Sequence, residues 1–123
     1  MSKSKICVIE DNNPIRMLFS TLLRKAGYEV VDFPNGQTAV EWLKANECFG
    51  IITDILLPDI SGNEVLNIVR QSALNKDVPA IAVTGYSDYD DKEKFLNYGF
   101  KHYMTKPVDV NTFVAEIRRV FNS

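Results

Sequence analysis

The sequence predicts one α/β domain of 123 residues, in which a doubly wound, five-stranded parallel sheet lies between two layers of helices. Short apolar runs alternate with amphipathic helical patterns along the chain, as in a (βα)5 arrangement. The first run has no polar interruption, which is typical of a strand buried on both faces. Right-handed crossovers between parallel strands place helices on both faces of such a sheet, so a three-layer sandwich follows.

The first half of the chain supplies strands and helices in strict alternation. Residues 6–9 form the first strand, and Pro14 opens the first helix, because proline suits the first helical turn. Gly27 follows as the expected C-terminal cap. The second strand, the second helix and the third strand are expected over residues 28–33, 36–46 and 50–54. The expected inward faces of the two helices are Ile15, Leu18, Phe19, Leu22, Leu23 and Ala26, and then Ala39, Val40 and Leu43.

The second half repeats this alternation. Ser61 is the expected N-cap of a third helix, and a fourth helix begins at Asp88 and ends at Gly99. Asp109 opens the last helix. The fourth and fifth strands are expected over residues 79–84 and 102–105. The apolar faces of the three helices comprise Val65, Leu66, Ile68 and Val69, then Phe95 and Leu96, and then Phe113, Val114, Ile117, Val120 and Phe121.

Composition argues against several classes of protein. The formal net charge is -2, so no basic field favours direct nucleic-acid binding. No apolar stretch has the length of a membrane span and no signal peptide precedes the first strand, so we expect no membrane insertion and a cytoplasmic location. Cys7 and Cys48 form no C-x-x-C pair and are interpreted as free thiols of a reducing compartment, with a disulfide between them as the alternative.

Polar residues that follow four of the strands are predicted to meet, because the carboxyl ends of parallel strands share one edge of the sheet. These residues are Glu10, Asp11, Asp54, Thr84 and Lys106. Two carboxylates about 4 Å apart repel by roughly 4 kcal/mol at an effective dielectric near 20. A hard dication such as Mg²⁺ offsets this repulsion, with Asp11 and Asp54 as direct ligands and Glu10 acting through water. Lys106 is expected to pair with Asp54 at rest.

Asp54 is the candidate nucleophile. A carboxylate can attack phosphorus and hold the product as an acyl phosphate. Mg²⁺ and Lys106 would neutralise the charge of the transferring group, and the Thr84 hydroxyl would complete its cradle. No Ser, Cys or His nucleophile with a paired base is evident at this edge, and the sole histidine, His102, has no obvious partner.

This chain resembles the receiver domain of two-component response regulators in an ordered set of residues, Glu10–Asp11, Asp54, Thr84–Gly85 and Lys106–Pro107. The stretch D-I-L-L-P-D-I-S-G from Asp54 to Gly62 is similar to the D-x-x-x-P-x-x-x-G loop around the phosphoaccepting aspartate of that family. The resemblance covers essentially the whole chain, so residues 1–123 are expected to form a single receiver domain. It implies a flavodoxin-like, CheY-like fold with the strand order 2-1-3-4-5.

The resemblance also implies a phosphorelay function. Asp54 would accept a phosphoryl group from a phosphohistidine of a sensor histidine kinase or of a histidine phosphotransfer protein. The backbone carbonyl of Leu56 would join Asp11 and Asp54 on Mg²⁺, with Mn²⁺ as a substitute ion. The Lys106–Pro107 peptide bond would be cis, a geometry that occurs almost only before proline and is uncommon even there. Such a domain promotes its own phosphorylation and is not a turnover enzyme.

Two surfaces are implied to meet partner proteins. Thr84 would move toward the phosphoryl group and Tyr103, the aromatic switch, would follow it inward. That movement would alter the surface of the fourth helix, fifth strand and fifth helix, which binds the downstream protein target. The helix that begins near Pro14 is a candidate docking patch for the phosphoryl donor, with Ile15 and Met17 near the site. The chain would act as a monomer or a phosphorylation-dependent dimer.

Two residues suggest a long-lived phosphorylated state. Leu56 lies two positions beyond Asp54, and Tyr86 lies two positions beyond Thr84. The resemblance implies that residues at these two positions set the lifetime of the phosphoryl group. Both are bulky and largely apolar. We hypothesise that they shield the acyl phosphate from attacking water.

Two other functions remain open at this point. A degenerate receiver would signal by contact without phosphate, but the complete acidic set with Thr84 and Lys106 argues against it. A flavodoxin-like cofactor-binding or hydrolytic enzyme would need a phosphate-binding loop, and no glycine-rich loop or Walker lysine follows the first strand. The chain is either a free-standing regulator or a receiver from a longer protein, and Met1 with the polar end at residues 122–123 favours the first.

Overall fold

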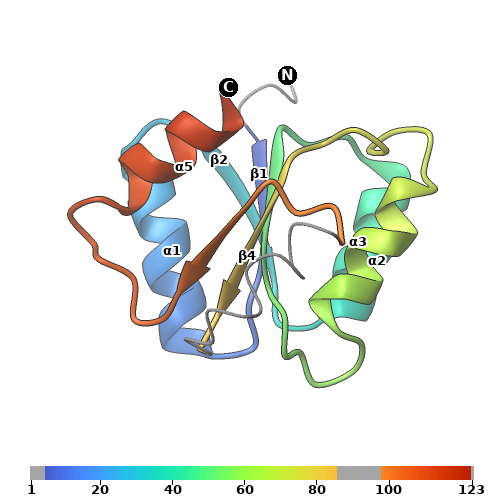
Figure 1. The fold of residues 1–123 in the computed structure, drawn as a ribbon, viewed down its shortest axis with the longest axis horizontal. Coiled ribbons are helices and arrows are strands. Elements are labelled where there is room, and N and C mark those ends of the chain that lie inside the picture. The colour runs from blue at the N-terminus through green and yellow to red at the C-terminus, as the bar shows by residue number, and fades with distance from the viewer. Residues whose placement is uncertain (1–4, 86–97, 123) are drawn as a thin grey trace.

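In the part of the chain that the structure describes, a five-stranded parallel sheet lies between two pairs of helices, which confirms the predicted fold class (Figure 1). The computed structural model describes residues 5–85 and 98–122. The strands follow the order β2-β1-β3-β4-β5. Helices α1 (Asn13–Lys25) and α5 (Phe113–Phe121) cover one face, and α2 (Gly36–Ala45) and α3 (Gly62–Arg70) cover the other. The expected fourth helix, with Asp88, Phe95 and Leu96, lies outside the described residues.

The strands end together at one edge of the sheet. They are β1 (Lys5–Ile9), β2 (Glu29–Phe33), β3 (Gly50–Asp54), β4 (Ala80–Thr84) and β5 (His102–Thr105). Ile9 of β1 lies opposite Thr53, and Asp54 lies opposite Val83. Thr84 in turn lies opposite Thr105 of β5. This register brings the residues that end or follow these strands to a common edge.

Side-chain caps explain where three of the helices begin. Asn12 Oδ1 accepts a hydrogen bond from the Ile15 amide at 2.9 Å. Asn35 Oδ1 does the same for Thr38 at 2.9 Å. Ser61 Oγ accepts from the Glu64 amide at 3.1 Å, which confirms Ser61 as the N-cap of α3. Each cap satisfies an amide that has no partner within its own helix.

Helix α1 differs from the sequence prediction at Leu18. Phe19 and Leu23 are buried as expected, and Ile15 and Leu22 pack against the same cluster, but Leu18 is 40% exposed. Ser20, which is polar, is buried instead. The Ser20 hydroxyl donates to Asp32 Oδ2 at 3.1 Å, so a hydrogen bond to β2 replaces apolar packing at this point.

Helix α5 begins later than predicted. It starts at Phe113, not at Asp109. The Asp109 carboxylate accepts from the Asn111 amide at 2.9 Å, and the Asp109 carbonyl accepts from Thr112 and Phe113 at 3.1 and 2.9 Å. Asp109 therefore closes a turn that leads into the helix, and its capping chemistry is used before the helix itself starts.

The core consists of two apolar clusters, one on each face of the sheet. Side chains alternate between the faces, so Cys7 and Ile9 join the cluster under α2 and α3, and Ile6 and Val8 join the cluster under α1 and α5. Both cysteines are free thiols, as predicted. Burial raises the pKa of the Cys48 thiol to about 12, so this thiol stays protonated at neutral pH. Across residues 5–85 and 98–122, none of the helices has the length and apolar character that crossing a membrane requires.

Candidate functional site

Three carboxylates meet at the carboxyl edge of the sheet. Glu10 and Asp11 follow β1, and Asp54 ends β3. One oxygen from each carboxylate lies within 4.8 Å of the other two. Glu10 is 1% exposed and Asp54 is 7% exposed, whereas Asp11 is open to solvent. The register of β1 with β3 makes this meeting possible, because Ile9 and Thr53 are paired residues just before the acids.

Lys106 brings one positive charge to this acidic cluster. Its Nζ lies 2.7 Å from Asp54 Oδ2 and 2.5 Å from Glu10 Oε1, so the expected pairing with Asp54 is present and Glu10 shares it. The Lys106 amide donates to the Thr84 carbonyl at 2.8 Å, which extends the β4–β5 ladder, and the Lys106–Pro107 peptide bond is cis. Burial by itself lowers the pKa of Lys106, but its contacts with Asp54 and Glu10 outweigh burial and raise it.

The cluster retains an excess of negative charge. Three carboxylates and one ammonium leave two negative charges when all are ionised. Burial raises the pKa of the Glu10 carboxyl above its usual range, although Lys106 and the Asn12 amide act in the opposite direction. A donor set made only of carboxylate oxygens suits a hard divalent cation such as Mg²⁺. The residues therefore fit the metal that the sequence predicts.

The loop that follows Asp54 folds back beneath it. The Leu56 amide donates to Asp54 Oδ1 at 3.2 Å, and the Gly62 amide donates to the Ile55 carbonyl at 2.9 Å. A Cβ at Gly62 would collide with the Asp54 carbonyl oxygen, so only glycine permits this approach. The loop thus holds the Asp54 carboxylate at the edge of the sheet.

Asp59 anchors the same loop to α2, a role that the sequence analysis missed. Its two carboxylate oxygens accept from the Gly36 and Gln37 amides at 2.9 and 2.7 Å. Slight burial acts to raise the pKa of Asp59, but these amides, with others of the backbone, outweigh it and lower the pKa. An acidic residue after Pro58 carried no sequence signal beyond the turn itself, because its partners lie more than 20 positions away.

Thr84, Tyr103 and His102 take different positions around the site. Thr84 is buried at the end of β4, on the edge that carries the carboxylates. Tyr103 is half-buried and packs against the apolar cluster under α2 and α3. The expectation that His102 has no partner was wrong, since His102 Nε2 lies 2.8 Å from Glu116 Oε1 on α5. The sequence did not reveal this pair because β5 and α5 are brought together only by packing.

Residues 6–118 match the family model of the response regulator receiver domain. The chain belongs to this family. It is therefore a receiver domain of two-component signalling, a class of signalling switches and not of turnover enzymes.

Named relatives agree with this assignment. The polar-differentiation response regulator DivK of Brucella anthropi is 32% identical over 118 residues, which cover 96% of this receiver and 95% of DivK. The chemotaxis response regulator CheY4 of Vibrio cholerae superposes with a TM-score of 0.89 at 26% identity, over 95% of this chain and 98% of CheY4. The receiver domain of sensor histidine kinase PA1611 from Pseudomonas aeruginosa has a TM-score of 0.87 at 27% identity over 98% of both chains, and its structure holds a magnesium ion in the active site cleft.

Two residues of this receiver were expected to shield the acceptor. The Leu56 side chain is 61% exposed next to Asp54. Tyr86 lies outside the described residues. The backbone carbonyl of Leu56 remains a predicted metal ligand.

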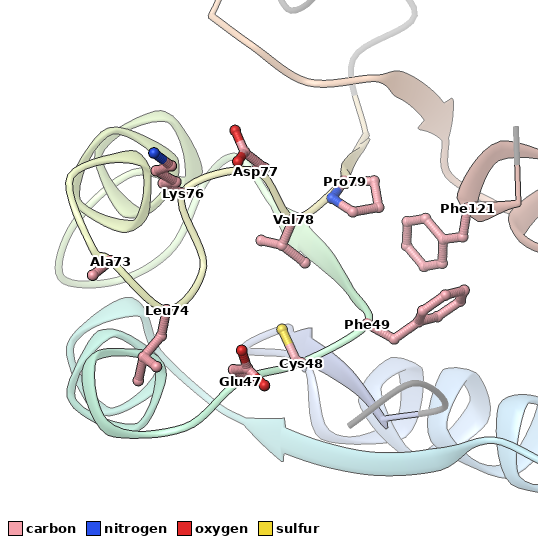
Figure 2. A pocket seen from close by; sticks show the side chains of 10 residues that line it. All are labelled: Glu47, Cys48, Phe49, Ala73, Leu74, Lys76, Asp77, Val78, Pro79 and Phe121. Atoms are coloured by element: carbon pink, nitrogen blue, oxygen red, sulfur yellow. The ribbon is translucent and has the colours of Figure 1, made fainter. Parts of the chain in front are cut away.

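A pocket of about 360 Å³ lies at the opposite edge of the sheet from the carboxylates. Figure 2 shows Cys48, Val78 and the rings of Phe49 and Phe121 around it. Gly50, next to Phe49, starts β3, and Asp54 ends it, so roughly 13 Å of strand separates the two edges. The pocket is therefore separate from the acidic site.

Proposed function

We propose that Asp54 of this receiver accepts a phosphoryl group from the phosphohistidine of a histidine kinase or a histidine phosphotransfer protein, in a reaction that depends on Mg²⁺. The observation that supports this most directly is the position of Lys106 Nζ between Asp54 and Glu10, beside the exposed Asp11. We further propose that residues 1–123 act as one receiver domain in the cytoplasm and bind other proteins, not nucleic acid.

Each residue of the site has a role in this proposal. An Asp54 oxygen attacks phosphorus, an O–P bond forms, and the P–N bond to the donor imidazole breaks with its electron pair going to nitrogen. Asp11, Asp54 and the Leu56 carbonyl would hold Mg²⁺, with Glu10 acting through water, and Mn²⁺ would substitute. The metal supplies charge neutralisation and alignment of the phosphoryl oxygens. Lys106 exchanges its contact with Asp54 for one with a phosphoryl oxygen.

The signal would leave the site through β4 and β5. Thr84 would bond the phosphoryl group, and Tyr103 would move inward toward the space that Thr84 leaves. The half-buried position of Tyr103 supports this role, since its ring already packs against the core and would need to move only further inward. The surface formed by the fourth helix, β5 and α5 would then change for the downstream target.

Intact-protein mass spectrometry tests the acceptor. Treatment with acetyl phosphate and Mg²⁺ should add one phosphoryl group to the wild-type chain, and an Asp54→Asn variant or EDTA should prevent the addition. Beryllium fluoride with Mg²⁺ should shift the amide NMR signals of the site in the wild-type chain only. A wild-type chain without an adduct rejects the proposal and leaves the phosphate-independent receiver. An adduct that persists in the Asp54→Asn variant rejects Asp54 as the acceptor.

Helix α1 supports a docking surface for the phosphoryl donor. Met17 is 70% exposed, whereas Ile15 packs against the core, so Met17 is the safer position to change. Met17→Asp should slow phosphoryl transfer from a phosphohistidine protein and leave phosphorylation by acetyl phosphate unchanged. If the Met17→Asp variant is phosphorylated at the wild-type rate by both donors, this part of α1 takes no part in docking.

A further inference from the structure

A hydrogen bond from α1 reaches the backbone of the acidic pair. Arg16 Nη1 donates to the Glu10 carbonyl oxygen at 2.9 Å. This carbonyl belongs to the peptide unit that joins Glu10 to Asp11, so the guanidinium holds the backbone from which both carboxylates project. The Arg16 side chain is 18% exposed, and a bond shielded in this way is stronger than one in open solvent.

The backbone amide of Glu10, on the other side of its Cα from this carbonyl, is hydrogen-bonded to β2. The Glu10 amide donates to the Phe33 carbonyl at 3.0 Å, and the Asn12 amide donates to Glu10 Oε2 at 3.1 Å. The amide of Glu10 is thus fixed by the sheet, and its carbonyl is fixed by Arg16. Removing Arg16 would therefore take away the side-chain hydrogen bond to the peptide unit that leads to Asp11.

Asp32 on β2 holds the guanidinium in place. Its Oδ1 lies 3.5 Å from Arg16 Nε, while its Oδ2 accepts from the Ser20 hydroxyl at 3.1 Å. Arg24 Nη2 lies 3.7 Å from the same Oδ2 but donates to the Val30 carbonyl, away from the acidic pair. Arg16, Ser20 and Arg24 are four residues apart on one stripe of α1, and Asp32 contacts all three.

We propose that Arg16 is a positioning residue for the acidic site: it holds the Glu10–Asp11 peptide unit in the arrangement that binds the divalent cation, and Asp32 acts through it. This inference rests on the proposed metal-dependent function. Partners that orient metal ligands typically change metal affinity by about 10-fold to 100-fold when they are removed.

The sign of the effect separates positioning from simple electrostatics. Arg16 carries a positive charge near the site, so its removal should strengthen cation binding if only charge matters. Its removal should weaken cation binding if the guanidinium positions the ligands. The lysine variant keeps the charge but lacks the planar fork that spans a carbonyl and a carboxylate, so positioning predicts weaker binding there too.

The test is a titration with MgCl2 in which the amide NMR signals of residues 10–12 report the Kd. Arg16→Met should weaken Mg²⁺ binding about 10-fold, and Arg16→Lys should weaken it by a smaller factor. Arg24→Met is the matched control, because Arg24 is also a cation in contact with Asp32 but makes no hydrogen bond to Glu10. The Kd of this variant for Mg²⁺ should stay within about two-fold of the wild-type value. Thermal melting and the remaining amide signals confirm that each variant is folded.

The role of Asp32 is tested by a double-mutant cycle. Asp32→Asn should weaken Mg²⁺ binding, and adding Asp32→Asn to Arg16→Met should cause no further loss if Asp32 acts through Arg16. A folded Arg16→Met variant that binds Mg²⁺ as tightly as the wild-type chain, or more tightly, overturns the inference while the proposed function stands. A wild-type chain that shows no Mg²⁺ binding rejects the proposed function itself.

Discussion

Neutralising Asp11 should stabilise this receiver in the absence of metal. The three carboxylates of the site lie within 4.8 Å of one another, and a single ammonium offsets only part of their charge. A pair of unit charges 4.8 Å apart repels by about 1 kcal/mol at the dielectric constant of water and by about 3.5 kcal/mol at an effective dielectric near 20. Asp11 is exposed, so the lower figure applies to each of its two repulsive pairs.

The expected net gain for Asp11→Asn is about 1 kcal/mol, because attraction to Lys106 is lost along with the repulsion from Glu10 and Asp54. For a domain of this size, that gain raises Tm by about 4 °C. Urea and thermal unfolding in EDTA measure both quantities. With MgCl2, the wild-type chain should gain stability according to RT ln(1 + [Mg²⁺]/Kd), and the variant should gain much less.

Glu41→Gln is the control for net charge, because Glu41 is an exposed carboxylate on α2. It should change stability little in either buffer. An Asp11→Asn variant that is less stable than the wild-type chain in EDTA would refute the reasoning, since repulsion between the carboxylates would then not destabilise the folded state. Equal stabilisation by Glu41→Gln would assign the effect to overall charge and not to the site.

The remaining predictions concern the loop around the acceptor. Asp59→Asn should lower stability at neutral pH by about 1 kcal/mol in urea unfolding, because a carboxylate that accepts two amides at the start of α2 is lost. The pKa of Asp59 is lowered in the folded state, so its contribution is present above the unfolded value near 4 and is lost as pH falls; the variant should lose less stability on acidification. Gly62→Ala should cost about 1–3 kcal/mol through its clash with the Asp54 carbonyl. Gly85→Ala, whose Cβ would meet none of the residues that the structure describes within 4 Å, should be nearly neutral, and equal melting curves for the two variants would contradict this account. Leu56→Asn should speed loss of the phosphoryl group by replacing an apolar neighbour with one that orients water; unchanged or slower loss in a radiolabelled time course would disprove the shielding hypothesis.

Local patterns were sufficient for most of the architecture. The apolar run before Glu10 predicted a buried strand, and Ser61 predicted the start of α3, because strand burial and helix capping depend on residues a few positions apart. The same rules erred at Leu18 and Asp109. Leu18 fits the periodicity of α1 but is 40% exposed, and Asp109 has a capping side chain that closes an earlier turn.

The candidate site was predictable in its members but not in its connections. The carboxyl edge of a parallel sheet gathers whatever follows the strands, so the order of residues along the chain was enough to group Glu10, Asp11 and Asp54. The hydrogen bonds of Asp59 and of His102 join residues more than ten positions apart. No periodic signal marks such pairs.

The sequence by itself determined the alternation of strands and helices, the chemistry available at one edge of the sheet and the family to which the chain is similar. Only the tertiary structure decided that Lys106 contacts Glu10 as well as Asp54, and that Arg16 holds the peptide unit between Glu10 and Asp11. The physical reason is one of range. Periodicity and capping depend on neighbours along the chain, whereas these contacts depend on how closely α1 and the loop after β5 approach the ends of β1 and β3, which the packing of the whole core sets.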